Sequence, residues 1–208
     1  MKVLAITTSG RRNGNVNNIC LKVLEGAKSA GNEVEIINLH DYNVNHCIGC
    51  LECTKTKKCI HKDDFETIYN KEKEADVIII GAPIYCHSVP GILKDFIDRS
   101  CSIVTPFADV KPNESLFGKL SIAQKYMQGF KVNAPFKSKK FITVLACNNP
   151  SKNSSDIKDA NSILKKFTDE MGGKIINRIK CADTLFKLNP KAVDKAYQQA
   201  FIIGTCLK

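Results

Sequence analysis

The chain has 208 residues, of which 43% are hydrophobic and 25% are charged, with 31 Lys and Arg against 21 Asp and Glu. This length suits one well-buried domain, and the composition is that of an ordinary globular protein rather than a disordered or fibrous one. The formal net charge of +10 does not indicate a nucleic-acid-binding protein, because the basic residues are scattered and no recognised nucleic-acid module is present.

A short apolar run at residues 2–7 gives way at once to Thr, Ser and Gly. The run is too short for the core of a signal peptide, and no stretch approaches the roughly 20 apolar residues of a membrane span. We therefore expect a cytoplasmic protein without a membrane partner. In that setting the ten cysteines indicate free thiols or metal ligands rather than a disulfide framework.

Hydrophobic periodicity predicts strands that alternate with helices along the chain. The run Val77–Gly81 is continuous and β-branched, as in a strand buried on both faces of a parallel sheet. Earlier in the chain, Asp63 and Asp64 are expected to cap the predicted helix 65–74, because an Asp side chain accepts hydrogen bonds from the free N–H groups of a first turn. The predicted strands cover residues 2–7, 33–39, 77–81, 141–146 and 174–179. The first predicted helix follows the first strand and ends by Gly31, and the later helices cover residues 65–74, 90–99, 155–171 and 190–206. Right-handed crossovers between these strands predict one α/β domain over residues 1–208 with a parallel sheet.

Residues 101–139 interrupt this alternation with three prolines, many lysines and weak periodicity. We interpret this segment as an insertion without an assigned role. Its apolar side chains suit a subunit interface and predict a homo-oligomer, either a dimer or a tetramer. These side chains are Phe107, Leu116, Phe117, Tyr126, Met127 and Phe130.

Four cysteines lie within thirteen residues, separated by two, two and five residues: Cys47, Cys50, Cys53 and Cys59. The spacing is close to the Cys-x2-Cys-x2-Cys-x3-Cys run that holds iron–sulfur clusters in bacterial ferredoxins, and it differs from the paired knuckles of a zinc ribbon. It predicts that the loop 47–59 wraps a single [4Fe–4S] cluster with all four thiolates. A zinc ion, or thiols that bind nothing, remain the alternatives.

Lysines surround the last of these cysteines, at Lys55, Lys57, Lys58 and Lys62. Positive charge beside a redox centre would steer an acidic, ferredoxin-type electron carrier toward it. The other cysteines are isolated in the sequence, and we expect them to be packed or loop thiols.

A polar loop, Thr7–Asn15, joins the first strand to the first helix at the sheet edge where open α/β proteins bind ligands. Its hydroxyls, amides and glycines lead into a helix N-terminus, whose free N–H groups and dipole favour an anion. The loop contains neither Gly-x-Gly-x-x-Gly nor Gly-Lys-Ser/Thr, so it lacks the signatures of dinucleotide and nucleoside triphosphate sites. It therefore suits a monophosphate such as that of FMN, which flavodoxin-like folds hold at this position.

Two further loops follow buried strands and are expected at the same edge. The loop Gly81–Ser88 offers backbone amides to the polar edge of a flavin, and Pro83 and Tyr85 offer rigid apolar contact. Asn148 and Asn149 follow the fourth strand. In the strand order 2-1-3-4-5 the second strand neighbours the first, so the cysteine loop is expected on the same rim of the sheet as the flavin phosphate. A loop on this rim can still be too far from the flavin ring of its own subunit, in which case a partner subunit could bring its cluster closer.

Three segments of the chain resemble the NADPH-dependent FMN reductase superfamily, and within it the iron–sulfur flavoproteins. Ser9–Asn15 resembles the family's phosphate loop, Cys47–Cys59 its compact cysteine motif, and Pro83–Arg99 its Pro-x-Tyr…Leu-Lys-x-Phe-Ile-Asp-Arg segment. The resemblance implies a flavodoxin-like fold, with a five-stranded parallel sheet in the order 2-1-3-4-5 and helices on both faces. Val16 stands where the family has a Thr, which implies looser binding of FMN. The residues that the resemblance places around FMN are Ser9, Arg11, Asn13, Asn15, Val16, Pro83, Ile84, Tyr85, Cys86, His87 and Ser88.

The favoured interpretation is an FMN-dependent oxidoreductase of the iron–sulfur flavoprotein type, which passes electrons between a [4Fe–4S] cluster and FMN. Its side chains need to supply no catalytic acid or base, because the cofactors carry the chemistry. The alternative is an NAD(P)H-dependent FMN reductase without a cluster, acting on quinones, nitro compounds or free flavin. A third is a non-catalytic redox sensor with the cysteine loop as its switch. Absorbance and iron content of the purified protein separate the first interpretation from the other two.

Overall fold

The computed structural model describes residues 1–104, 135–148, 155–182 and 190–208. Five parallel strands form one sheet in the order β2-β1-β3-β4-β5. The strands are β1 (Lys2–Thr7), β2 (Glu33–Asn38), β3 (Val77–Pro83), β4 (Lys140–Ala146) and β5 (Lys174–Cys181). The predicted flavodoxin-like sheet and its strand order are confirmed.

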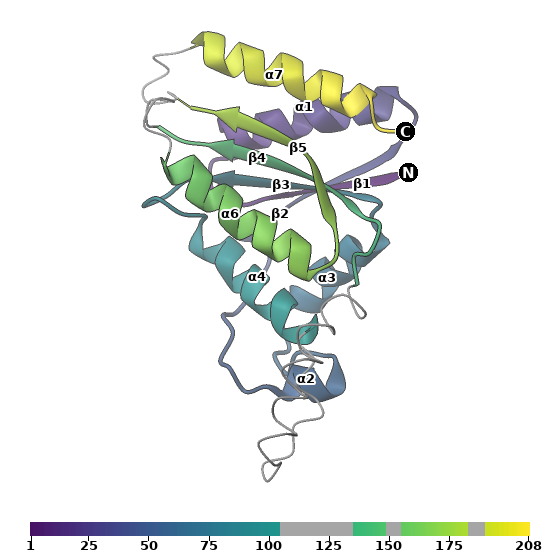
Figure 1. The fold of residues 1–208 in the computed structure, drawn as a ribbon, viewed down its shortest axis with the longest axis vertical. Helices are drawn as coiled ribbons and strands as arrows, with labels where there is room; N and C mark the ends of the chain where they lie inside the picture. The colour runs from purple at the N-terminus through teal and green to yellow at the C-terminus, as the bar shows by residue number, and fades with distance from the viewer. Residues whose placement is uncertain (105–134, 149–154, 183–189) are drawn as a thin grey trace, which may run out of the picture.

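Helices cover both faces of the sheet (Figure 1). One face carries α1 (Asn15–Ser29) and α7 (Pro190–Thr205), and the other carries α3 (Phe65–Glu74), α4 (Gly91–Val104) and α6 (Ser155–Glu170). The 3-10 helix η1 (Leu39–Asp41) and the short helix α2 (Glu52–Thr56) interrupt the long connection from β2 to α3. No helix in the described ranges is both long enough and apolar enough to cross a membrane.

The sheet separates two apolar clusters, and its strands contribute to both. Strand β3 is buried along its whole length, as its β-branched run predicts. Side chains alternate along β1, so that Leu4 and Ile6 pack in the cluster with α3 and α4, while Val3 and Ala5 pack in the cluster with α1 and α7. Burial on both faces fixes the strand register, because a slip of one residue would exchange the two faces.

The two edge strands carry charges and one irregularity. Glu33 is exposed on β2, and Arg178 and Lys180 are exposed on β5. The pairing register of β4 with β5 shifts between Phe141 and Ile142. Edge charges and bulges of this kind keep a sheet from pairing with further strands.

The start of α3 corrects one detail of the sequence-based prediction. Asp64 occupies the N-cap position, but its side chain makes no capping hydrogen bond. Its Oδ2 atom instead accepts from the backbone N–H of Asn43 at 2.7 Å. The backbone N–H of Phe65 donates to Asp63 Oδ1 at 3.2 Å. The expected capping role therefore falls to Asp63 alone.

Most of the predicted insertion, 101–139, lies outside the described residues. Residues 101–104 complete α4, which therefore extends beyond its predicted end at Arg99. Residues 135–139 form a turn that leads into β4. The apolar side chains predicted for a subunit interface all fall within 105–134, outside the described part of the chain.

Candidate functional site

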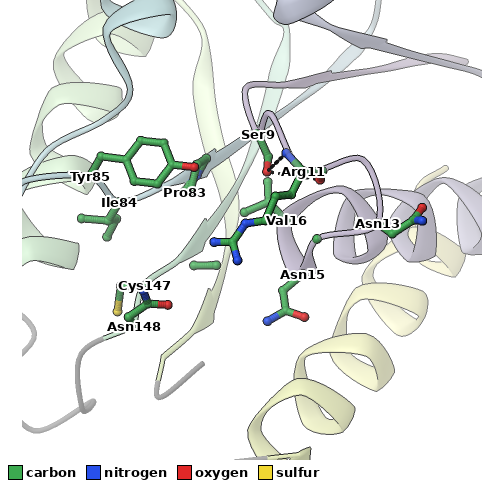
Figure 2. Close-up of a pocket in the computed structure, with 12 residues that line it drawn as sticks. Ser9, Arg11, Asn13, Asn15, Val16, Pro83, Ile84, Tyr85, Cys147 and Asn148 are labelled. Carbon is green, nitrogen blue, oxygen red and sulfur yellow. Dashed lines mark hydrogen bonds between the residues drawn. The ribbon is translucent and has the colours of Figure 1, made fainter. Parts of the chain in front are cut away.

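A cavity of about 400 Å³ opens at the carboxyl edge of the sheet, where β1, β3 and β4 end (Figure 2). Its walls come from the three loops that follow these strands, as predicted. The lining residues are Ser9, Arg11, Asn13, Gly14, Asn15, Val16, Pro83, Ile84, Tyr85, Ala146, Cys147 and Asn148. Every predicted residue of the loop after β1 belongs to this set.

The N-terminus of α1 forms one wall of the cavity, through Asn15 and Val16. The N-cap residue is Gly14, which has no side chain to cap the helix, and the first turn contains no acidic residue. The N–H groups of this first turn are thus available to an acceptor from outside the helix, and the helix dipole favours negative charge there. This wall suits a phosphate or another oxyanion.

Hydrogen bonds, most of them buried, hold the loop after β1 in place. The backbone N–H and the hydroxyl of Thr8 both donate to the carbonyl of Gly81, at 2.9 and 3.0 Å. The backbone N–H of Arg11 donates to the Ser9 hydroxyl at 3.3 Å, a bond drawn in Figure 2, and the Asn38 side chain donates to the Ser9 carbonyl at 2.9 Å. Because Thr8 and Ser9 are also buried, the loop is preformed for a ligand.

Two adjacent arginines of this loop have different surroundings. Arg12 is ion-paired with Asp41, and this bond holds the pKa of the carboxyl below its ordinary value. Arg11 lines the cavity and forms no ion pair with any described residue. Figure 2 shows the Arg11 guanidinium in the space between Asn15 and Tyr85. Arg11 is therefore a cation available to an anionic ligand.

The loop after β3 closes in a tight two-residue turn. Tyr85 and Ser88 exchange two backbone hydrogen bonds of 3.0 Å, and Cys86 and His87 between them have positive φ angles of 46° and 64°. Turns of this geometry favour Asn-Gly, and a left-handed backbone costs other residues about 1–2 kcal/mol each. The protein thus holds a strained turn beside the mouth of the cavity, as is common at functional sites.

The predicted flavin contacts at residues 83–88 divide into two groups. Pro83, Ile84 and Tyr85 line the cavity, and Tyr85 is 47% exposed, so its ring offers a surface to a planar ligand. Cys86, His87 and Ser88 form the turn and do not belong to the lining. Their contact with a flavin stays a prediction.

His87 connects the turn to α6. Its Nδ1 atom lies 2.6 Å from Oδ1 of Asp156, in the first turn of that helix. The hydrogen bond to Asp156 raises the pKa of His87. Asp156 is buried whereas the His87 side chain is 72% exposed, so the ring marks the outer rim of the site.

The end of β4 and the loop after it add two lining residues that sequence reasoning missed, Ala146 and Cys147. The N–H of Ile84 donates to the Ala146 carbonyl at 2.8 Å, which joins this loop to the one after β3. Only their position in the sequence could have identified these residues, because Ala146 ends a buried strand and Cys147 directly follows it. Asn148 lines the cavity as predicted, and Asn149 lies outside the described residues.

A second, smaller cavity is lined by all four cysteines of the loop 47–59. Cys53 is buried, Cys59 is half-buried, and Cys47 and Cys50 are exposed. The backbone turns tightly around this space through left-handed residues Gly49, Leu51 and Lys57. The other lining residues are Ile48, Gly49, Leu51, Ile60, His61 and Arg99. The predicted cysteines are therefore brought together around one space.

The four thiols also interact electrostatically. Burial raises the pKa of Cys53, and the nearby thiols of Cys59, Cys47 and Cys50 raise it further. Within the described ranges, no group of three or more His, Cys, Asp or Glu side chains is arranged to hold a metal ion. No disulfide joins any of the ten cysteines, all of which are described. The sulfur atoms thus share a cavity without forming a ready-made site for one ion.

The position of the thiol cavity differs from the prediction. The two cavities share no lining residue. Figure 1 shows α2 below α4, at the end of the molecule opposite α7 and away from the sheet. The expectation of a shared rim is wrong, because the chain after β2 leaves the strand ends and runs past α4, where the thiols meet Arg99.

Comparison with known proteins shows which family this chain matches. Residues 1–130 match the model of the family described as NADPH-dependent FMN reductase. An iron–sulfur flavoprotein of Archaeoglobus fulgidus is 44% identical over 101 residues, which are 48% of this chain and 49% of that protein. An iron–sulfur flavoprotein of Methanocaldococcus jannaschii is 42% identical over 100 residues, 48% of this chain and 52% of that protein. The chain thus spans about half the length of the curated relatives it matches.

A solved structure resembles nearly the whole chain. The NAD(P)H:quinone oxidoreductase from Methanothermobacter marburgensis has a TM-score of 0.72 with this chain, at 12% identity, over 99% of this chain and 94% of that one. At this identity the likeness concerns the fold.

Proposed function

The chain belongs to the NADPH-dependent FMN reductase family, and from this premise we propose that it binds FMN at the carboxyl edge of the sheet and works as an FMN-dependent oxidoreductase. The observation that carries the proposal is the uncapped N-terminus of α1 in the wall of a 400 Å³ cavity, with Arg11 beside it. Bound there, FMN would accept and release electrons for a donor and an acceptor that meet its exposed ring.

The residues present fit the parts of FMN. The first-turn N–H groups of α1, with Ser9, Arg11 and Asn15, provide donors for the phosphate. Pro83, Ile84 and Tyr85 on the opposite side provide apolar and aromatic surface for the ring system. This chain's share of the work is to bind, orient and partly expose the flavin.

We further propose that the cysteines of the loop 47–59 hold a [4Fe–4S] cluster, which would exchange single electrons with a partner protein and with the flavin. Support comes from the shared cavity, from the mutual influence of the thiols, and from the two relatives named iron–sulfur flavoproteins. Zinc held by the same four thiols is the alternative, and the relatives named iron–sulfur flavoproteins favour the cluster over it. Exposed Lys57, Lys58 and Lys62 beside this cavity would favour an acidic, ferredoxin-type donor.

The separation of the two cavities supports a homo-oligomer. The two cavities share no lining residue, and Figure 1 shows α2, which contains Cys53, beyond α4 from the sheet, so the two proposed centres would not lie side by side within one subunit. A second copy would bring its thiol loop to the exposed flavin edge, at which Tyr85 is open to solvent.

The test is anaerobic purification with FMN, iron and acid-labile sulfide quantified per chain. We expect stoichiometric FMN and about four irons per chain, the content of one such cluster. If the protein contains FMN but no iron or sulfide, and oxidises NAD(P)H rapidly, the result would favour an FMN reductase without a cluster over an iron–sulfur flavoprotein. A protein that retains neither FMN nor iron under these conditions would overturn both proposals.

A further inference from the structure

Arg99, on the face of α4 toward the cysteine loop, is one of the largest fully buried side chains in the described part of the molecule. Its guanidinium makes two hydrogen bonds to Asp63, from Nη1 to Oδ2 at 2.6 Å and from Nη2 to Oδ1 at 2.8 Å. Only 1% of the Arg99 side chain and none of the Asp63 side chain is exposed. The guanidinium also lies over the ring of Phe65, 4.3 Å from its centroid. The charge is therefore fixed in position on several sides.

The same ion pair closes the base of the cysteine loop. Asn45, two residues before Cys47, donates to Asp63 Oδ2 through its backbone N–H at 2.9 Å and through its side chain at 3.0 Å. The carbonyl of Asn45 accepts from Arg99 Nη1 at 3.1 Å. Both ends of the loop are thus tied to one guanidinium on α4, and the position of the thiols depends on it.

One donor of Arg99 is left over. Its Nε atom is buried and has no hydrogen-bond partner among the described residues. Arg99 lines the thiol cavity together with the four cysteines. The two hydrogen bonds to Asp63 pair the guanidinium, a group that stays protonated in proteins, so a positive charge lies in the wall of this cavity. A buried donor without a partner is costly unless a ligand supplies the acceptor.

We propose that Arg99 is a positioning residue for the sulfur-bound centre, with its Nε–H and its charge directed to the sulfur ligands and Asp63 holding the guanidinium in place. This inference rests on the proposed [4Fe–4S] cluster. Hydrogen bonds to the sulfurs, net charge and solvent exposure set the potential of such a centre. A fixed cation stabilises the more negative, reduced form, so Arg99 raises the reduction potential.

The experiment measures the midpoint potential of the cluster by redox titration, followed by electron paramagnetic resonance, in anaerobically reconstituted protein. Arg99→Gln alone would leave Asp63 as a buried, unpaired charge, so the main variant is the neutral pair Asp63→Asn with Arg99→Gln. Arg99→Lys keeps the charge but removes Nε and the forked geometry. Lys58→Gln is the control, because it removes an equal charge from a side chain near Cys59 that is 74% exposed. Circular dichroism and FMN content verify the fold of each variant.

We expect a lower potential in the neutral pair, a smaller shift in Arg99→Lys, and no shift in Lys58→Gln. A wild-type potential in the neutral pair, or an equal shift in Lys58→Gln, would overturn the role of Arg99. If the neutral pair fails to fold or to take up iron, Arg99→Lys decides by the same measurement, and an unchanged potential in it overturns the proposal. If the wild-type protein contains no iron, both the proposed cluster and this inference are wrong. If the variants contain iron but have unchanged potentials, only the inference about Arg99 is wrong.

Discussion

Gly26 of α1 and Gly204 of α7 meet backbone to backbone where the two helices cross. A Cβ atom on Gly204 would lie 2.1 Å from the carbonyl oxygen of Val23, and one on Gly26 would lie 2.2 Å from that of Phe201. Both distances are far inside van der Waals contact, so neither position accepts a side chain unless the helices move apart. The packing of this helical layer depends on the two glycines.

Gly204→Ala is expected to destabilise the protein by about 3 kcal/mol, the upper end of the usual cost of overpacking, because the new methyl group meets rigid backbone. Urea unfolding measures the change. Gly91→Ala at the start of α4 is the matched control, since a Cβ there meets no atom within 4 Å. Equal stabilities of the two variants would show that the helices separate without cost.

Glu72 gives a prediction about pH. Its carboxyl is fully buried without a hydrogen-bond partner among the described residues, and burial raises its pKa from 4.5 to about 8. Between these values the folded protein keeps a proton that the unfolded chain releases. The contribution of Glu72 to wild-type stability therefore falls as pH rises from about 4.5 to about 8, by up to about 1.4 kcal/mol per pH unit.

Glu72→Gln removes this titration, so the variant should gain stability relative to wild type as pH rises from 5 to 8, with the difference levelling off above 8. Urea unfolding at pH 5, 6, 7, 8 and 9 measures the difference. Glu66→Gln on the same helix is the control, because the Glu66 side chain is 62% exposed. A pH-independent difference between Glu72→Gln and wild type would mean that Glu72 titrates near its ordinary value.

Loss of Arg11 and Asn15 together should weaken FMN binding by a few kcal/mol, because each charge-assisted hydrogen bond to a phosphate contributes about 1.5–3 kcal/mol. Quenching of FMN fluorescence on binding gives the dissociation constants of the Arg11→Ala, Asn15→Ala variant and of wild type. Arg12→Ala is the control, since Arg12 lies next in sequence but pairs with Asp41 outside the cavity lining. An unchanged FMN affinity in the double variant would show that the FMN phosphate does not bind at this wall of the cavity.

Cys50→Ser is expected to prevent cluster assembly and to leave FMN bound, because the two cavities share no residue. Reduction through a ferredoxin-type donor should then fail. Iron, sulfide and FMN contents provide the measurement. Cys206→Ser is the control, since Cys206 is also exposed but lies at the end of α7. Full iron content in Cys50→Ser would exclude Cys50 as a ligand.

Local sequence patterns predicted the sheet and the loops that line the larger cavity, because both depend on neighbours in the sequence. The run Val77–Ile80 is continuously β-branched and forms a strand buried on both faces. The loop Ser9–Asn15 joins a strand to a helix, and parallel strands bring such loops to one edge. Both features are therefore visible before any tertiary contact is known.

The features that the sequence did not predict depend on contacts between distant residues. In the sequence, Arg99 belongs to a predicted helical segment. In the structure, its side chain bonds to Asp63, 36 residues earlier, and links the cysteine loop to α4. Glu72 stands between Lys71 and Lys73 in a polar stretch, yet it is fully buried. Cys86 and His87 carry no turn signal, because the surrounding structure imposes their left-handed backbone.

The charged edges of the sheet bear on how copies of this chain could join in the proposed homo-oligomer. Copies that joined by extending the sheet would add strands without limit and build a fibre. Exposed Glu33 on one edge, and Arg178 and Lys180 beside a register shift on the other, oppose that mode of growth. In the proposed homo-oligomer, contact between copies would therefore use helical faces and loops, where rotational symmetry can close an assembly at a fixed number of subunits.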